Sequence, residues 1–224
     1  AVTLTGTGAQ LDGLTITETA TGNVTATAVA GEDLTGVDIA GTLTVGLAAT
    51  GSVVLTGLTA AGTGVTITSG SGDNAITLSA AGIAETIVYV TTVSGTDTIA
   101  TFETGEDFFS TDFAITDDFT FNTTVVNLGI ALDATVQGVA EVTGVTAAAD
   151  MTVDQDVIDA ISNGTITVAA DESIMLAVLT TDGDTYLYEA TDADTSSTID
   201  DGELSLVGVF TATDLATNDI IATV

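Results

Sequence analysis

Oxygen-bearing side chains alternate along residues 191–203, which read TDADTSSTIDDGE. An EF-hand loop binds calcium through oxygen ligands at its positions 1, 3, 5, 7, 9 and 12, where position 7 offers a backbone carbonyl and position 12 a bidentate glutamate. With Asp192 as position 1, the spacing predicts a calcium site whose ligands are Asp192, Asp194, Ser196, Thr198, Asp200 and Glu203.

Two positions depart from the usual loop. Ser196 is a neutral ligand where an acid or amide is common, and Ser197 stands where a glycine usually makes the sharp turn. A side chain with positive φ costs about 1 kcal/mol or more. Because both flanks resemble strands, an acidic hairpin turn remains the alternative interpretation. If the loop binds calcium, we expect an affinity suited to extracellular concentrations, and we expect Ile199 to anchor the loop to the core.

A second candidate lies at residues 69–78, SGSGDNAITL. Gly70, Gly72 and Asp73 partly match the glycine-rich calcium nonapeptide G-G-x-G-x-D-x-U-x. A β-roll needs successive copies of this motif so that neighbouring turns share each ion, and here there is one. The segment therefore predicts a turn.

The chain carries 32 acidic residues and no Lys, Arg or His, which gives a formal net charge of −32. Self-repulsion on this scale destabilises a compact state unless cations collect or bind, so we expect divalent cations, calcium above all, as partners. Nucleic acids are excluded as partners because no side chain can neutralise phosphate. Hydrophobic residues make up 45% of the chain, which favours a folded protein, yet no apolar run is long enough to insert into a membrane as a helix.

Catalytic chemistry has few residues to use. Without His, Cys, Lys or Arg there is no ordinary general base near neutral pH, no thiolate and no cationic oxyanion site. A pair of carboxylates of the kind that glycosidases use would remain, but no such pair can be located. We expect that the protein is not an enzyme.

Short segments rich in Thr and Val, separated by Gly, predict strands through the first third of the chain. From about residue 41 these strands begin every ten to twelve residues. The predicted fold class is all-β, a Thr/Gly-rich β-solenoid or β-sandwich with one or two short helices in the C-terminal half. Paired threonines such as Thr66 and Thr68 recur at irregular intervals, which favours a Thr-covered outer face over a regular hydroxyl array that orders water.

The remaining chain is more acidic. A helix near 153–162 is predicted by an apolar stripe of Val153, Val157, Ile158 and Ile161, with Thr152 and Gln155 as a capping box. A hairpin is predicted over 172–191, with its turn at Asp182-Gly183, and a further strand over 203–210. We predict a Thr/Gly-rich β domain over 1–84 and an acidic β-rich domain over 85–224.

The run ETIVYVTTVSGTDTIATFETGEDFF at 85–109 contains Asp97-Thr98-Ile99, Phe102, Gly105 and Asp107. It resembles the segment that follows the repeats of RTX-type, haemolysin-type calcium-binding proteins. Residues 182–210 are similar to the C-terminal region of large bacterial surface proteins exported by type I secretion, S-layer proteins among them. The resemblance implies an uncleaved C-terminal export signal, for which Asp219–Val224 is the candidate, and folding outside the cell triggered by calcium.

These observations predict a secreted structural protein that assembles with copies of itself into a cell-surface layer, sheath or extracellular filament stabilised by calcium. The expected location is extracellular, at a bacterial cell surface. The alternative is a calcium-dependent adhesin or another binding module, with an ice-binding module as a less favoured form.

Overall fold

The computed structural model of the protein describes residues 3–17, 23–28, 31–34, 36–39, 41–56, 58, 60–61, 64–80, 82–89, 95–111, 123–124, 130–131, 139–146, 150–162, 166–167, 173–194, 196, 198–215 and 219–222. The chain divides into two units. Residues 1–113 and 219–224 form the first, and residues 114–218 form the second. The predicted domain boundary between residues 84 and 85 falls inside the first unit.

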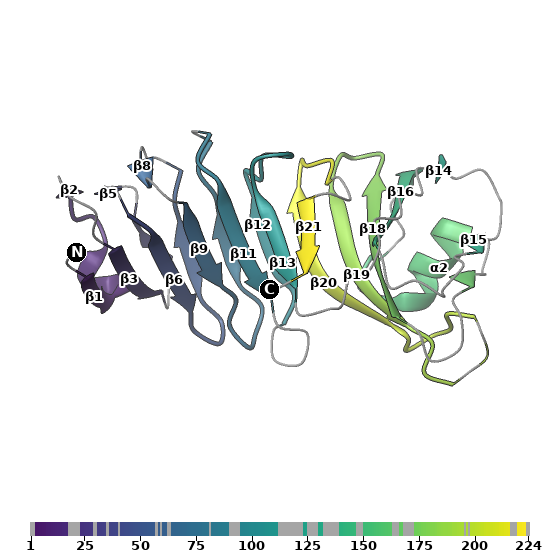
Figure 1. Ribbon diagram of the computed structural model, residues 1–224. Helices are drawn as coiled ribbons and strands as arrows, with labels where there is room; N and C mark the ends of the chain where they lie inside the picture. The colour runs from purple at the N-terminus through teal and green to yellow at the C-terminus, as the bar shows by residue number, and fades with distance from the viewer. Residues whose placement is uncertain are drawn as a thin grey trace. The chain divides into compact units, whose positions relative to one another are not determined.

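The first unit is a β-solenoid, in which successive turns of the chain lay their strands beside one another in parallel (Figure 1). One sheet has the order β1 (Thr3–Thr7), β3 (Asn23–Ala28), β6 (Leu43–Leu47), β9 (Val65–Thr68), β11 (Glu85–Tyr89), β13 (Phe108–Thr111) and β21 (Ile220–Ala222). A second sheet includes β12 (Asp97–Ala100), β10 (Ala75–Thr77), β7 (Ser52–Val54) and β4 (Glu32–Asp33). A third, short sheet has the order β2 (Ile16–Thr17), β5 (Val37–Ile39) and β8 (Ala60–Ala61).

The predicted strand spacing of ten to twelve residues is half of one solenoid turn. Consecutive long strands alternate between the first and second sheets, so that β6, β9 and β11 are neighbours in one sheet and β7 and β10 in the other. Val45 pairs with Ile67, and Ile67 pairs with Ile87, so a full turn takes about twenty residues. The all-β prediction is confirmed, with the solenoid as its form.

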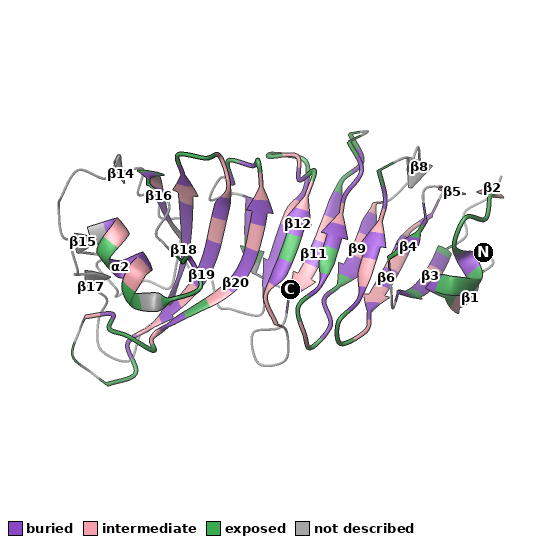
Figure 2. Cartoon of the chain, turned by 180° about the vertical axis from the view of Figure 1, so that it is seen from behind, coloured by how far each residue is buried: buried purple, intermediate pink, exposed green. Residues whose placement is uncertain are grey.

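The core of the first unit follows from the alternation of Val or Ile with Thr. In β6 and β11 every second residue is buried, and the intervening residues are half-buried (Figure 2). Val45, Ile67, Ile87 and Phe109 pair in sequence across four strands, and each has no exposed surface. The stacking of turns therefore builds one continuous apolar column out of strands that are individually short.

The segment at residues 69–74 is a turn, as predicted. A Cβ atom on Gly70 would overlap the carbonyl oxygen of Ala48, and one on Gly72 would overlap that of Ala49. Glycine is required at both positions because this turn packs directly on the backbone of the preceding turn of the solenoid. The two glycines therefore serve close stacking here.

One short helix, α1 (Gly8–Leu11), lies in the N-terminal part of the first unit, where no helix was predicted. Its four residues are too few to show helical periodicity in the sequence. Gln10 Oε1 accepts a hydrogen bond from the backbone N–H of Thr7 at 3.0 Å, and Leu11 is buried. The helix thus connects β1 to the following segment with one apolar anchor.

The second unit contains a mixed sheet. Its strands follow the order β14 (Thr123–Thr124), β16 (Val139–Val145), β18 (Ser173–Thr180), β19 (Thr185–Thr191) and β20 (Leu204–Thr211), and a separate pair joins β15 (Ile130–Ala131) to β17 (Ile166–Thr167). The strands from β14 to β18 pair in parallel, and those from β18 to β20 pair antiparallel. The hairpin predicted over 172–191 is confirmed, with Gly183 at φ 96° in its turn.

The helix predicted near 153–162 is α2 (Asp154–Ser162). Val157, Ile158 and Ile161 are buried in a cluster with residues of β16, β18 and β19. Val153 is 43% exposed, so the predicted apolar stripe was wrong at its first position because the helix begins one residue later.

The predicted capping box of α2 was also wrong. The Thr152 hydroxyl donates to Asp150 Oδ1 at 2.6 Å, and the Gln155 side chain donates to Asp159 Oδ1 at 2.8 Å. Both side chains therefore bond to acidic neighbours, which this chain supplies in abundance. Neither helix in the described part of the chain has the length and apolar character needed to cross a membrane.

Candidate metal site

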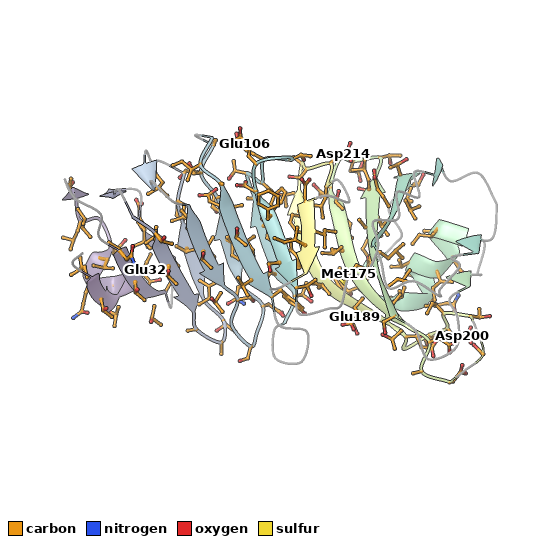
Figure 3. The ribbon with its side chains drawn as sticks, viewed as in Figure 1. Glu32, Glu106, Met175, Glu189, Asp200 and Asp214 are labelled. Carbon is orange, nitrogen blue, oxygen red and sulfur yellow. The ribbon has the colours of Figure 1, made fainter. Side chains whose placement is uncertain are left out.

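The predicted calcium loop connects two antiparallel strands, β19 and β20 (Figure 3 labels Asp200 within it). The backbone N–H of Thr191 donates to the carbonyl oxygen of Glu203 at 3.0 Å, which closes the base of the loop. Ile199 has no exposed surface and belongs to the apolar cluster of the second unit. The expectation that Ile199 anchors the loop to the core is confirmed.

Three of the six predicted ligands come together. Asp192, Asp194 and Glu203 each offer a carboxylate oxygen, and these oxygens lie within 4.8 Å of one another. Asp192 is buried, Glu203 is half-buried and Asp194 is exposed. Three like charges this close repel one another unless a cation or protons lie between them.

The Glu203 carboxylate holds the backbone of the loop. Its Oε1 accepts hydrogen bonds from the N–H groups of Ala193 at 2.8 Å and Asp194 at 3.3 Å, and its Oε2 accepts one from Asp200 at 2.9 Å. An ionised carboxylate has about four lone-pair sites, so these bonds leave capacity for a cation. Glu203 therefore orders the loop and faces the other two acids at the same time.

The other three predicted ligands make contacts of their own within the loop. The Ser196 hydroxyl donates to the carbonyl oxygen of Thr198 at 2.9 Å and accepts from the Thr198 N–H at 3.1 Å. The backbone N–H of Ser196 donates to Asp194 Oδ1 at 2.9 Å. The carboxylate of Asp200 is not among the three that converge, and Ser197 lies outside the described residues.

The donor set suits a hard divalent cation. Carboxylate oxygens are the ligands that calcium prefers, and calcium accepts irregular geometry. Asp192 makes other interactions, but its Oδ1 atom is buried and accepts no hydrogen bond in the described part of the chain. Asp192, Asp194 and Glu203 are thus the residues that would hold the ion.

A second group of carboxylates lies inside the first unit. Glu85 and Asp107 have no exposed surface, and Asp107 Oδ1 accepts a hydrogen bond from the Glu85 N–H at 3.0 Å. Asp107 Oδ2 accepts from the Glu103 N–H at 2.8 Å, while both oxygens of Glu85 lie 3.0 Å from the Ser79 N–H. Burial raises the pKa of Glu85 to about 8 and that of Asp107 to about 6.

Asp97 is a third buried carboxylate of the first unit that accepts hydrogen bonds from another part of the solenoid. Its Oδ2 accepts from the Ser69 hydroxyl at 2.6 Å, and its Oδ1 accepts from the Asn74 side chain at 2.8 Å and the Asn74 N–H at 3.2 Å. Asn74 Oδ1 in turn accepts from the Gly51 N–H at 2.8 Å. Burial raises the pKa of Asp97 to about 6. Hydrogen bonds of Asp97 and Asn74 therefore connect three successive turns of the solenoid, through Gly51, Asn74 and Asp97.

Sequence reasoning did not find this role, although the signal was present. Glu85 and Asp97 are the first residues of β11 and β12, and Asp107 and Asp219 immediately precede β13 and β21. Asp219 Oδ1 accepts from the Gly105 N–H at 2.9 Å. An acid at the start of a strand, repeated from turn to turn, therefore marks a carboxylate that bonds to the backbone of a neighbouring turn.

Residues that carry the resemblance in the sequence occupy structural positions in the solenoid. Ile99 and Phe102 are buried, and Gly105 has φ 83° in the turn before Asp107. Comparison of the chain with family models, with curated proteins and with solved structures finds no match.

Proposed function

We propose that the protein is a secreted structural protein that assembles with copies of itself at a bacterial cell surface and is stabilised by calcium. The observation that carries this proposal is the convergence of Asp192, Asp194 and Glu203 in a chain without a single Lys, Arg or His. The chain has no cationic side chain that could neutralise this group, so the neutralising charge has to come from bound cations or from protons.

The solenoid supplies a surface for assembly. Strand β1 stands first in its sheet and pairs with β3 alone among the described strands. Its outer edge presents backbone N–H and C=O groups that a strand of another molecule can pair with. Calcium would act in the same direction by screening the repulsion between two chains that each carry a formal charge of −32.

The proposal is tested by titrating calcium into the purified, metal-free chain and then adding a chelator. Folding is followed by circular dichroism and assembly by sedimentation velocity and electron microscopy. We expect ordered polymers at roughly millimolar calcium, and we expect them to dissolve when the chelator is added. A chain that stays a monodisperse monomer throughout would refute self-assembly.

Two matched variants separate the loop from general charge screening. Asp194→Asn removes one carboxylate of the group, and its amide oxygen can still accept the bond from Ser196. Asp201→Asn removes the same charge from an exposed position two residues before Glu203, outside the group. We expect Asp194→Asn to need a higher calcium concentration for assembly than Asp201→Asn. Equal responses would mean that calcium acts by screening alone.

A further inference from the structure

Threonines line up across five neighbouring strands of the first unit. Thr5, Thr25, Thr44, Thr66 and Thr86 pair with one another in register across β1, β3, β6, β9 and β11, which lie side by side in Figure 1. The adjacent column, two residues further along each strand, holds Thr7, Thr27, Gly46, Thr68 and Val88. Eight threonines thus form a two-dimensional array, which we call the threonine array.

The threonine array faces outward. The residues between its threonines, such as Ala26, Val45 and Ile67, are buried in the core. The threonines themselves are exposed or half-buried, as expected for the outer face of a continuous sheet. Thr7 belongs to a capping box at the start of α1. Within the described part of the chain the other seven hydroxyl groups make no hydrogen bond to the protein, so they are left for the surroundings.

The array is regular in space although it is irregular along the chain. The five threonines of the first column are separated by 20, 19, 22 and 20 residues, and the loops absorb the differences. The irregular spacing therefore gives no argument against an ordered hydroxyl surface, because strand pairing sets the positions.

The second sheet of the same solenoid provides an internal comparison. One of its outward columns runs Asp33, Val54, Thr77 and Ala100, and the adjacent one runs Ser52, Ala75 and Thr98, so the residue types are mixed in both. Strand propensity alone would be satisfied by such a mixture. The uniform column on the first sheet is therefore not a general consequence of building a solenoid.

The array is also free of charge in a strongly acidic protein. Neither column contains an ionisable side chain, and none occurs between Asp38 and Asp73, a stretch that includes β6 and β9. A charged group would hold water in a shell centred on itself. A surface of methyl and hydroxyl groups permits water to adopt a lattice.

We propose that the threonine array binds ice. Paired strands lie about 4.8 Å apart, and alternate residues along a strand lie about 6.6 Å apart, so the hydroxyls repeat in two directions at spacings comparable to those of oxygen atoms on an ice surface. Each threonine adds a methyl group that excludes disordered water beside the hydroxyl. The ligand is solid water, and the site is the outer face of β1, β3, β6, β9 and β11.

The proposal is tested on the purified full chain by measuring thermal hysteresis and the growth of ice grains in a frozen film. We expect the chain to shape ice crystals and slow their recrystallisation. Thr66→Lys, in the middle of the array, should abolish most of both effects. Thr77→Lys is the matched control, because Thr77 is equally half-buried on the outward face of β10 and lies outside the array.

Each outcome bears on the proposal. No effect of the wild-type chain on ice would overturn it, and so would equal losses in Thr66→Lys and Thr77→Lys. Circular dichroism checks whether both variants fold. If Thr66→Lys does not fold, Thr66→Ser, which keeps the hydroxyl group and adds no charge, is measured in its place. A change of oligomeric state in Thr66→Lys with unaltered ice activity would instead assign the face to contact between copies of the chain, and would refute the ice-binding proposal.

Discussion

Glu85 and Asp107 occupy equivalent positions in adjacent turns of the solenoid, and the Asp107 carboxylate accepts a hydrogen bond from the Glu85 N–H at 3.0 Å. Both side chains are fully buried, and no cationic side chain exists in the chain to offset their charge. Burial therefore raises the pKa of both carboxyl groups, to about 8 for Glu85 and about 6 for Asp107.

The first prediction concerns pH. Because the folded unit binds these protons more tightly than the unfolded chain, the stabilisation is fully present below about pH 4 and is lost as pH rises through about 6 and then about 8. We expect the free energy of unfolding of the first unit to fall over this range, by on the order of a few kcal/mol. Urea unfolding at several pH values measures it.

Two variants test the assignment to Glu85. Glu85→Gln is neutral at every pH and should flatten the upper part of the profile. Glu106→Gln removes an exposed carboxylate whose charge helps to raise the pKa of Asp107 but not that of Glu85, so it should leave the upper part of the profile unchanged. Stability that increased between about pH 5 and about pH 8 would contradict the prediction.

The second prediction concerns calcium and the second unit. A ligand that binds only the folded state stabilises it by about 2.7 kcal/mol at about 100 times its Kd. We therefore expect calcium to raise the thermal unfolding midpoint of the wild-type second unit by several degrees, and to raise it much less in Asp194→Asn. Differential scanning calorimetry with and without calcium measures the shift, with Asp201→Asn as the control.

The third prediction compares two glycines. A Cβ on Gly70 would overlap the carbonyl oxygen of Ala48, whereas one on Gly105 would meet nothing within 4 Å and would pay only for its φ of 83°. Gly105→Ala should cost about 1–2 kcal/mol of stability, and Gly70→Ala should cost more, because two turns of backbone must separate. Equal losses in denaturant unfolding would show that the turns are not in close contact.

The fourth prediction concerns the approach to α2. The buried Tyr188 hydroxyl donates to the carbonyl oxygen of Met151 at 2.7 Å, three residues before the helix begins. Tyr188→Phe leaves that carbonyl without this donor and should cost about 1–2 kcal/mol. Tyr186→Phe on the same strand, where the ring is half-buried, should cost under about 0.5 kcal/mol. The urea unfolding midpoints of the two variants, each compared with that of the wild-type chain, test this difference.

Local patterns in the sequence were sufficient for the elements with regular alternation. The strands around Val45 and Ile67 and the hairpin turn at Gly183 were predictable, since each depends on neighbouring residues. The pairing of β13 with β21 was not predictable, because it joins residues more than a hundred positions apart. The column from Thr5 to Thr86 was not predictable for a related reason. It depends on the register between paired strands, which cannot be read from the sequence because the loops between them differ in length.

The candidate site was only partly predictable. The alternation of acids identified Asp192, Asp194 and Glu203, but it could not show that Ser196 and Thr198 bond to each other within the loop. The buried carboxylates Glu85 and Asp107 were missed because the sequence shows an acid at a strand start without showing the backbone group that it meets.

The pairing of β21 with β13 has a consequence for the order in which the protein is made. Residues 220–222 complete a sheet whose other six strands are already present by residue 111. The ribosome therefore synthesises residues 114–218, the whole second unit, before it synthesises β21, the last strand of the first unit. The first unit can therefore be completed only after every residue of the second unit has been added to the chain.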